Sequence, residues 1–263
     1  MKKYFAFFLL AIVSIVLAAC GSSDDKGSSA GEDSENTLII GIDDKFAPMG
    51  FRDDKNEIVG FDIDYARAVA EEMGMEVKFQ PIDWKTKESE LISGRIDLIW
   101  NGYTITEDRK EKVLFTEPYL ANSQVVITLE DSKLTNISDL AGKNVGVQAL
   151  SSALDALNAN PVSKEVGSVA EFADNVLALT DLKTGRIDAV VIDEVVANYY
   201  SALEEGTFKI LEESLAPEEY GIGVKKGNEE LLEKLQAALD KLNENGKAAE
   251  ISEKWFGENK VLN

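Results

Sequence analysis

Two seven-residue stretches of this chain are nearly the same: Leu91-Ile92-Ser93-Gly94-Arg95-Ile96-Asp97 and Leu182-Lys183-Thr184-Gly185-Arg186-Ile187-Asp188. Five of the seven positions are identical, and the two glycines, 94 and 185, stand 91 positions apart. Each stretch has the pattern of a helix that ends at its glycine and a strand that begins at its isoleucine. The spacing is too long for a solenoid repeat, so the pair predicts two similar α/β lobes.

The elements around the two stretches follow one order: strand, helix, strand, helix, strand. In the first copy, apolar patterns predict strands at 38–42, 76–79 and 96–100, with helices at 62–73 and 88–93. In the second they predict strands at 144–147, near 166 and at 187–192, with helices at 151–158 and 175–184. Asp62 is expected to cap the first helix and Gly74 to follow its last turn. Such a series favours mostly parallel sheets covered by helices.

Polar residues follow the predicted strands at corresponding places in the two copies. Asp43 and Gln148 come after the first strand of each copy, and Asn101-Gly102 and Asp193 come after the third. Ligands of open parallel sheets bind beyond the carboxyl ends of the strands. If the two lobes face each other, these residues line one cleft.

Arg109 is the cation that stands out near this cleft. It follows Thr104-Ile105-Thr106-Glu107-Asp108, which reads as a loop entering a helix with both acids in the first turn. A cation there opposes the helix dipole unless an anion docks between the guanidinium and the free backbone N–H groups. The alternative is an exposed arginine paired with a neighbouring acid, and spacing alone favours that alternative.

Each of the other candidate residues could instead have a purely structural role. Asp193 either meets a cation at its strand end or caps the segment 194–200, with equal weight. Ser152 opens a helix whose N–H groups can bind an anion, although serines there are most often plain caps. Phe46 and Trp84 can stack on a ligand, but aromatic residues beside apolar strands more often belong to the core.

The composition excludes several classes of function. The formal charge is −21, which disfavours nucleic acid as a partner. The chain has no histidine and only one cysteine, so histidine-dependent hydrolases, His-ligated zinc and disulfide frameworks are excluded. No phosphate-binding glycine loop and no calcium-loop spacing is present, and we expect no cofactor and no metal ion.

That one cysteine, Cys20, lies at the end of an N-terminal targeting pattern. Lys2 and Lys3 precede an apolar run at 4–17, and Leu17-Ala18-Ala19-Cys20-Gly21 resembles the lipobox of bacterial lipoproteins. The resemblance implies a signal peptide at 1–19 and a lipidated Cys20 that anchors the chain to the outer face of a cell membrane. The alternative of a single transmembrane helix suits the run poorly, because a span needs about 20 apolar residues. Polar residues make up 21–36, so 20–36 is predicted to be a flexible tether.

Five short motifs occur in an order that resembles the polar amino-acid-binding proteins of bacterial ABC importers. They are Gly60-Phe61-Asp62-Ile63-Asp64, Gly102-Tyr103-Thr104-Ile105-Thr106 with Arg109, Phe115-Thr116 with Pro118-Tyr119, Gly142-Lys143 with Val145-Gly146-Val147-Gln148, and Gly185-Arg186-Ile187-Asp188-Ala189. The resemblance implies a periplasmic-binding-protein-like fold of type II, in which two α/β lobes joined by a hinge close over a ligand cleft. Lobe 1 would comprise 37–125 and 225–263, and lobe 2 would comprise 126–224.

The resemblance also implies roles in binding one free amino acid. Arg109 would hold the α-carboxylate with the backbone N–H groups of Thr104 and Ser152. Asp193, the carbonyl of Gly102 and the hydroxyl of Thr104 would receive the α-ammonium group. An ABC permease and its ATPase would be the partners of the closed form.

The same comparison assigns the side-chain end of the cleft. Phe46 and Trp84 would flank the ligand side chain, with Asp43 and Glu88 near it, which suits a polar, cationic or cystine-like side chain. One departure is Leu150, which stands where relatives usually have glycine; it is expected to narrow the cleft or to shift the amide of Ser152.

Two other functions stay open at this point. A secreted, dehydratase-like enzyme on the same fold would need an acid or base in the cleft, and Glu88 or Glu117 would be the candidates. A sensor or adhesin could use the fold, although no signalling domain follows Asn263 in this sequence. The resemblance favours a binding protein that is not an enzyme.

Overall fold

A computed structural model describes residues 36–262, and the chain from Asn36 onward forms one compact unit. The predicted signal peptide, Cys20 and all of the predicted tether except Asn36 lie outside the described residues. Within the described part, no helix is long and apolar enough to span a bilayer.

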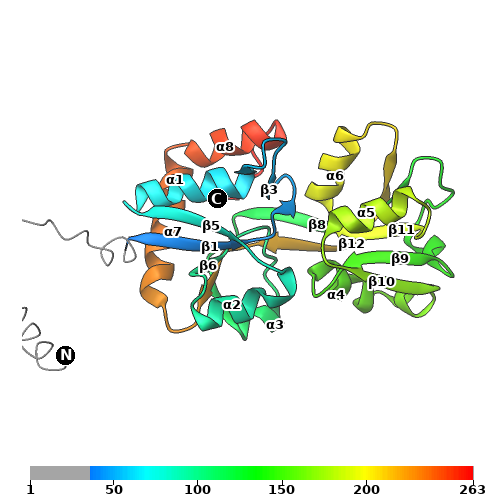
Figure 1. Ribbon diagram of the computed structural model, residues 1–263, viewed down its shortest axis with the longest axis horizontal. Coiled ribbons are helices and arrows are strands. Elements are labelled where there is room, and N and C mark those ends of the chain that lie inside the picture. Colours follow the sequence, from blue (N-terminus) through cyan, green and yellow to red (C-terminus); the bar gives the residue numbers. More distant parts are fainter. Residues whose placement is uncertain (1–35, 263) are drawn as a thin grey trace, which may run out of the picture. The chain divides into compact units, whose positions relative to one another are not determined.

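Lobe 1, as the structure has it, is built on a five-stranded sheet in the order β5-β1-β6-β13-β7 (Figure 1). Its strands are β1 (Thr37–Ile42), β5 (Glu76–Pro81), β6 (Leu98–Ile99), β7 (Val113–Phe115) and β13 (Gly223–Lys225). A small sheet adds β2 (Lys45–Phe46), β3 (Gly50–Arg52) and β4 (Ile58–Val59). The helices are α1 (Phe61–Glu72), α2 (Lys87–Ser93), α3 (Glu107–Lys110), α7 (Glu229–Glu244) and α8 (Lys247–Phe256), with a 3-10 turn at Trp84–Thr86.

Lobe 2 is built on a second five-stranded sheet in the order β10-β9-β11-β8-β12. Its strands are β8 (Leu120–Leu129), β9 (Asn144–Gln148), β10 (Ser168–Phe172), β11 (Ala189–Asp193) and β12 (Phe208–Tyr220). Its helices are α4 (Ser152–Ala159), α5 (Asn175–Lys183) and α6 (Glu194–Leu203), with 3-10 turns at Ile137–Leu140 and Pro161–Lys164. The prediction of two α/β lobes is therefore confirmed.

The sheets are more mixed than the pattern predicted. β1 runs parallel to β5 and β6, and β9 runs parallel to β10 and β11, as expected. However, β13 is antiparallel to both β6 and β7, and β8 is antiparallel to β11 and β12. The antiparallel strands belong to the segments that pass between the lobes, which a βαβ pattern does not describe.

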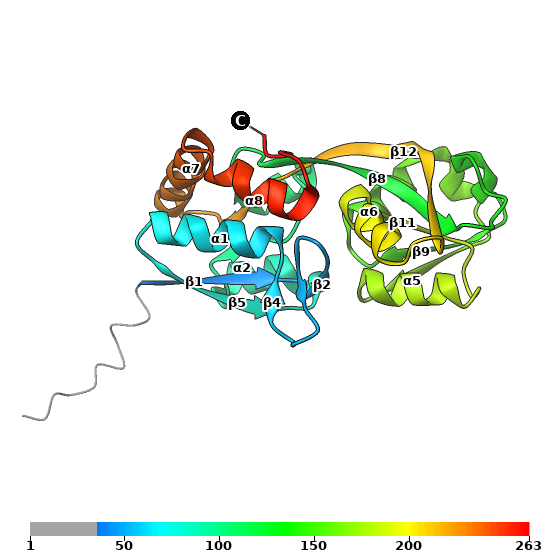
Figure 2. The ribbon, with the colours of Figure 1, turned by 90° about the horizontal axis from the view of Figure 1, so that it is seen from above.

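The two passages between the lobes are paired with each other. β8 and β12 form a long antiparallel ribbon, which Figure 2 shows along one side of lobe 2. At the lobe 1 end of this ribbon, Leu120 pairs with Tyr220. The chain then joins lobe 1 at once, because the N–H of Gly221 donates to the carbonyl of Tyr103 at 3.0 Å.

The repeated stretches adopt the same local structure in both lobes. Gly94 and Gly185 are both left-handed, with φ of 75° and 70°, and each follows the last turn of a helix. The aspartate three residues later uses its Oδ2 to accept a backbone N–H of the neighbouring first strand: Asp97 from Ile39 and Asp188 from Asn144, each at 2.8 Å. The predicted equivalence of the two lobes thus extends to individual hydrogen bonds.

The expectation that Asp62 caps α1 is wrong. Gly60 occupies the N-cap position, and Asp62 is the second residue of the helix. Its side chain points into the protein, where it accepts a hydrogen bond from the N–H of Gly102 at 2.7 Å and from the hydroxyl of Tyr119 at 3.0 Å. Gly74 does follow the last turn of α1, with φ of 67°.

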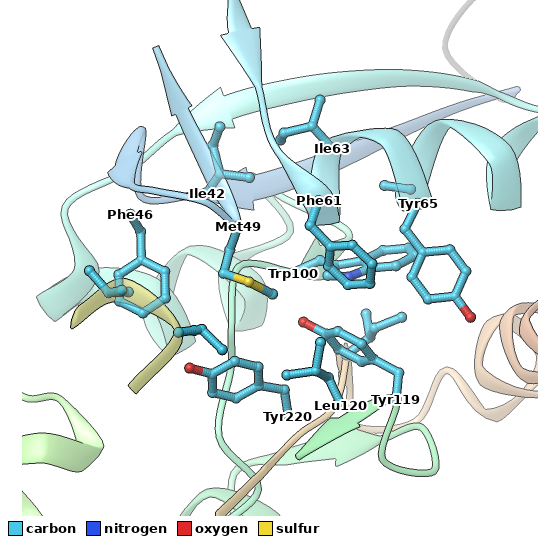
Figure 3. Packing of buried hydrophobic residues seen from close by; sticks show 14 of the residues in the cluster. Ile42, Phe46, Met49, Phe61, Ile63, Tyr65, Trp100, Tyr119, Leu120 and Tyr220 are labelled. Carbon is cyan, nitrogen blue, oxygen red and sulfur yellow. The ribbon is translucent and has the colours of Figure 1, made fainter. Parts of the chain in front are cut away.

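Aromatic side chains fill the core of lobe 1 beside this carboxylate. Figure 3 shows Phe61, Tyr65 and Trp100 packed with Tyr119, all of them buried. Burying a large side chain of this kind contributes about 1.5–3 kcal/mol. This core holds α1 against the sheet and supports the loop after β6, which carries Gly102 and Thr104.

Candidate functional site

Side chains from the carboxyl ends of the central strands meet between the two lobes, as the topology predicted. Asp43 follows β1 and Gln148 ends β9; Gln148 Nε2 donates to Asp43 Oδ2 at 2.7 Å. Thr104 Oγ1 and Ser152 Oγ lie 3.0 Å apart, also across the lobes. The eight predicted site residues include seven with buried side chains: Asp43, Phe46, Trp84, Thr104, Arg109, Ser152 and Asp193; the eighth is Gly102.

Arg109 is a buried cation without an acidic partner. Only 5% of its surface is exposed, and no ion pair in the described residues includes it. Its Nη1 donates to the carbonyl of Thr104 at 2.8 Å, and its guanidinium lies 4.7 Å from the centre of the Tyr103 ring. The exposed, ion-paired alternative therefore does not apply. A guanidinium has five N–H donors, so most of this one's hydrogen-bonding capacity is available for an anion.

The backbone near Arg109 also presents donors. Thr106 caps the short helix α3 by accepting from the N–H of Arg109 at 3.2 Å. On the opposite lobe, Ser152 is the first residue of α4, and Ser151 is its cap. The first N–H groups of a helix have no partner within it, and they carry partial positive charge. An anion placed beside Arg109 and Thr104 would meet the N-terminus of α4, because Ser152 lies against Thr104.

Asp193 ends β11 and stands at the N-cap position of α6, but its side chain does not cap the helix. Instead, Oδ1 accepts from Gln124 Nε2 at 2.7 Å and Oδ2 accepts from the hydroxyl of Tyr220 at 3.2 Å. Burial raises the pKa of Asp193 well above its usual value, and the nearby carboxylate of Glu218 raises it further, while Arg109 lowers it. A cation at this place would stabilise the ionised form.

Asp43 is a second buried carboxylate, located where Gln148 of lobe 2 meets lobe 1. It accepts from Gln148 and from the N–H of Lys45 at 3.1 Å, and it has no ion pair among the described residues. Burial raises its pKa to about 6. Lys45 itself reaches across to Asp174 of lobe 2, with Nζ 2.9 Å from Oδ2. Asp43 is thus free to receive a donor or a cation from a ligand.

Gly102 lies beneath two aromatic rings. Its φ is +58°, and a Cβ there would lie 2.7 Å from Phe46 and 3.2 Å from Tyr220. Both the left-handed backbone and this contact require glycine. Asp62 holds the N–H of Gly102 from the core side, and burial raises the pKa of Asp62 to about 7.

Trp84 packs into lobe 1 while its neighbour Lys87 reaches the opposite lobe. The Trp84 ring lies edge-on to Tyr103 at 6.0 Å. Lys87 is buried, and its Nζ donates to the carbonyl of Trp84 at 3.2 Å and to that of Leu150 at 3.0 Å. Burial lowers the pKa of Lys87 to about 8.

Leu150, the departure noted in the sequence, has a left-handed backbone with φ of 53°. Leucine therefore adopts the conformation that glycine adopts readily, at a cost of about 1–2 kcal/mol. Its side chain is 56% exposed.

The two acids considered for catalysis lie in different places. Glu88 Oε1 accepts from the hydroxyl of Tyr103 at 3.0 Å and lies 3.4 Å from Lys87 Nζ. Glu117 is exposed, and its N–H donates to Gln236 of α7 at 2.9 Å. Residues 36–262 contain no group of three or more metal-ligating side chains.

Three residues of this site were not predicted: Gln124, Glu218 and Lys87. Gln124 and Glu218 come from the strands that connect the lobes, where polar residues alternate with others. Asn122 and Gln124 are two apart on β8, as are Glu218 and Tyr220 on β12, so each pair shares one face of its strand. This alternation is the signal that was available in the sequence.

Comparison with known proteins finds the same architecture. The family model of bacterial extracellular solute-binding proteins, family 3, matches residues 38–258. The chain is 30% identical to the arginine-binding extracellular protein ArtP of Bacillus subtilis (97% of this chain, 98% of that protein). It is 34% identical to the ABC transporter glutamine-binding protein GlnH of the same organism (98% of each). A substrate-binding protein of an ABC uptake transporter from Streptococcus pneumoniae, solved with bound histidine, superposes with a TM-score of 0.85 at 40% identity (91% of this chain, 100% of that chain).

Proposed function

Because the chain belongs to the bacterial extracellular solute-binding proteins of family 3, we propose that it binds one free polar amino acid between its lobes and delivers it to an ABC-type importer. The observation that carries this proposal is Arg109, a buried guanidinium that has no ion pair within residues 36–262. Arg109 lies close enough to Asp193 and Glu218 to lower the pKa of both carboxyl groups. A buried cation close to carboxyl groups suits a zwitterion, which carries one negative and one positive charge.

The α-carboxylate of the ligand is assigned to Arg109, with the backbone N–H groups of Thr104 and Ser152. The α-ammonium group is assigned to Asp193, the carbonyl of Gly102 and the hydroxyl of Thr104. A buried charge is tolerated only with an opposite charge and hydrogen bonds, and the ligand supplies both in one molecule.

This arrangement makes closure depend on the ligand. Arg109, Gly102 and Thr104 belong to lobe 1, whereas Ser152 and Asp193 belong to lobe 2. A ligand that contacts both lobes has higher affinity for the closed form, and this difference drives the equilibrium toward closure. The permease and its ATPase would recognise that closed form. The proposed lobe boundaries, 37–125 with 225–263 and 126–224, differ by a few residues from the sheets, because β8 begins at Leu120 in the lobe 2 sheet and β13 begins at Gly223 in the lobe 1 sheet.

The side chain of the ligand is assigned to the end of the cleft near Phe46, Trp84 and Asp43. Asp43 and Gln148 offer a carboxylate and an amide there, which suits a side chain with N–H donors or a positive charge. Relatives are named for arginine and glutamine, and the S. pneumoniae protein holds histidine, all of which have polar side chains.

A lipid anchor at Cys20 would keep the binding protein at the outer face of the membrane, near its permease. Two acyl chains give stable attachment, whereas one gives only marginal binding. Cys20→Ser is expected to release the protein into the medium, as measured by immunoblotting of the membrane and medium fractions. Retention in the membrane fraction would show that the anchor lies elsewhere.

The function is tested by thermal shift on the fragment 37–263, unfolded and refolded to remove carried-over ligand. A ligand at 100 times its Kd stabilises the folded state by about 2.7 kcal/mol, which raises Tm by roughly 5–10 °C in a domain of this size. We expect such a shift with one or a few of the free amino acids or cystine. No shift with any of them would overturn the proposal.

A further inference from the structure

Glu218 is a second acidic side chain at the place assigned to the ligand's ammonium group. It lies on β12, two residues before the chain joins lobe 1, and Gln124 connects it to Asp193. Gln124 Nε2 lies 2.7 Å from Asp193 Oδ1 and 2.9 Å from Glu218 Oε1. Asn122 Nδ2 also donates to Glu218 Oε1, at 2.6 Å.

The register of the sheet keeps this group together. Gln124 is paired with Asp193 on β11, and Asn122 is paired with Glu218 on β12. All four residues therefore belong to the sheet of lobe 2, so they move as one unit when the lobes separate. Arg109, which comes from lobe 1, approaches them only when the lobes are together.

The two carboxylates have fewer hydrogen-bond donors than they can use. An ionised carboxylate accepts about four hydrogen bonds. Among the described residues, Asp193 accepts from Gln124 and Tyr220, and Glu218 accepts from Gln124, Asn122 and the hydroxyl of Ser152, which is five donors for about eight acceptor positions. Gln124 is fully buried, and its Oε1 has no partner in the described part of the chain. An ammonium group with three N–H donors matches this deficit.

The charges around the pair also favour a cation. The carboxyl groups of Asp193 on β11 and Glu218 on β12 face each other. The other groups around them are Arg109 from α3, the amides of Asn122 and Gln124 from β8, and the hydroxyls of Ser152 from α4 and Tyr220 from β12. Burial raises the pKa of both Asp193 and Glu218, and their proximity raises that of Asp193 further. Two carboxyl groups, the buried one of Asp193 and the half-buried one of Glu218, thus share one nearby guanidinium.

We propose that Glu218 and Asp193 form a joint carboxylate pair for the ligand's α-ammonium group, and that this group replaces a proton held by the ligand-free pair. This inference rests on the proposed function and names a binding residue beyond the set assigned there. It makes the positive charge of the ligand a condition for binding. It also makes binding release protons, so affinity rises with pH over the range in which the ligand-free pair titrates.

The test compares Glu218→Gln with Glu219→Gln in the fragment 37–263. Both changes remove one negative charge from adjacent positions on β12, but Glu219 is exposed and serves as the matched control. Isothermal titration calorimetry is done with L-arginine, L-histidine and L-glutamine as probes. Measurements at one pH in two buffers of different ionisation enthalpy give the number of protons released.

We expect Glu218→Gln to weaken binding by at least about tenfold, because a hydrogen bond to a charged group contributes that much or more. It should also reduce the proton release and the preference for the amino acid over the matching acid without an α-amino group. Glu219→Gln should match wild type in all three. The Tm of each variant is also measured without ligand. It should not fall for Glu218→Gln, whereas the loss of a merely structural side chain would lower it.

The outcomes separate the two proposals. If Glu218→Gln binds the probes with wild-type affinity and releases the same number of protons, this inference is overturned and the proposed function stands. Equal losses for amino acids and their des-amino analogues also overturn it. If the wild-type protein binds none of the three probes, the amino acid found by thermal shift replaces them, and failure to bind any free amino acid or cystine overturns both proposals.

Discussion

Replacing Arg109 by methionine removes the charge and the hydrogen bonds of the guanidinium but keeps an unbranched side chain of similar length. A guanidinium binds a carboxylate through two parallel bonds, each contributing about 1.5–3 kcal/mol when charged groups are involved. Their loss amounts to about 3–6 kcal/mol, so the Kd for the amino acid should rise between roughly 100-fold and 10,000-fold.

The fold should survive this change, because Arg109 forms no ion pair in the part of the chain that the structure describes. Its bonds in the ligand-free protein are one to the carbonyl of Thr104 and the contact with Tyr103. Removing a buried cation also removes the cost of its desolvation, which offsets that loss. We therefore expect the ligand-free Tm of Arg109→Met to remain within a few degrees of wild type.

Calorimetry with the ligand found by thermal shift measures the effect. Arg186→Met is the matched control, because it makes the same change at an exposed arginine paired with Asp181. Arg109→Lys should fall between methionine and wild type, since lysine retains the charge without the paired geometry. Binding by Arg109→Met within tenfold of wild type would refute the assignment of the ligand carboxylate to this residue.

Three further predictions concern other parts of the site. Asp193→Asn should weaken amino acids by at least about tenfold and their des-amino analogues much less, measured by calorimetry; equal losses would argue against an ammonium contact. The pKa of Asp43 in the folded protein is about 6, above its ordinary 3.8, so its ionisation destabilises the ligand-free fold as pH rises through this range. Asp43→Asn should therefore raise ligand-free stability at pH 7.5 by up to about 3 kcal/mol in urea unfolding, and a loss of stability would contradict the pKa. For a ligand with a cationic side chain, Asp43→Asn should remove the part of the pH dependence of affinity that is centred near pH 6, whereas the part that comes from Asp193 and Glu218 should remain. Leu150→Gly should change stability by between zero and about +1 kcal/mol, because relief of the left-handed strain exceeds the added entropy of the unfolded chain; Leu203→Gly, at an exposed position in α6, should instead lose about 1 kcal/mol.

The sequence predicted the features that depend on local pattern. The repeated stretches at 91–97 and 182–188 indicated two equivalent lobes, and the structure reproduces even the hydrogen bonds of Asp97 and Asp188. The carboxyl ends of the strands correctly brought Asp43 and Gln148 together, because sheet topology alone determines that edge.

Features that depend on how distant segments cross were not predicted. Asp62 looked like a helix cap because it opens an amphipathic run, but only the folded chain shows that the N–H of Gly102 lies beside it. Gln124 and Glu218 lie on strands whose alternating polar residues resemble a solvent-facing edge. Gln124 is nevertheless buried and Glu218 half-buried, because the two strands pass between the lobes. The burial of Arg109, whose guanidinium lies over the ring of Tyr103, likewise could not be predicted from its spacing in the sequence.

The strand order of lobe 1 has a consequence for how the chain acquires its fold. β13 at 223–225 lies between β6 at 98–99 and β7 at 113–115. Until the chain has been made as far as Lys225, the middle of this sheet lacks a strand, and β6 and β7 have no common neighbour. The helices α7 and α8, which follow β13, complete the covering of the same sheet. A chain that is synthesised from its N-terminus therefore cannot complete lobe 1 before lobe 2 has been synthesised. A truncation that ends before residue 223 removes the strand that joins β6 to β7, so lobe 1 is expected to stay incomplete in such a chain even though the whole of lobe 2 is present.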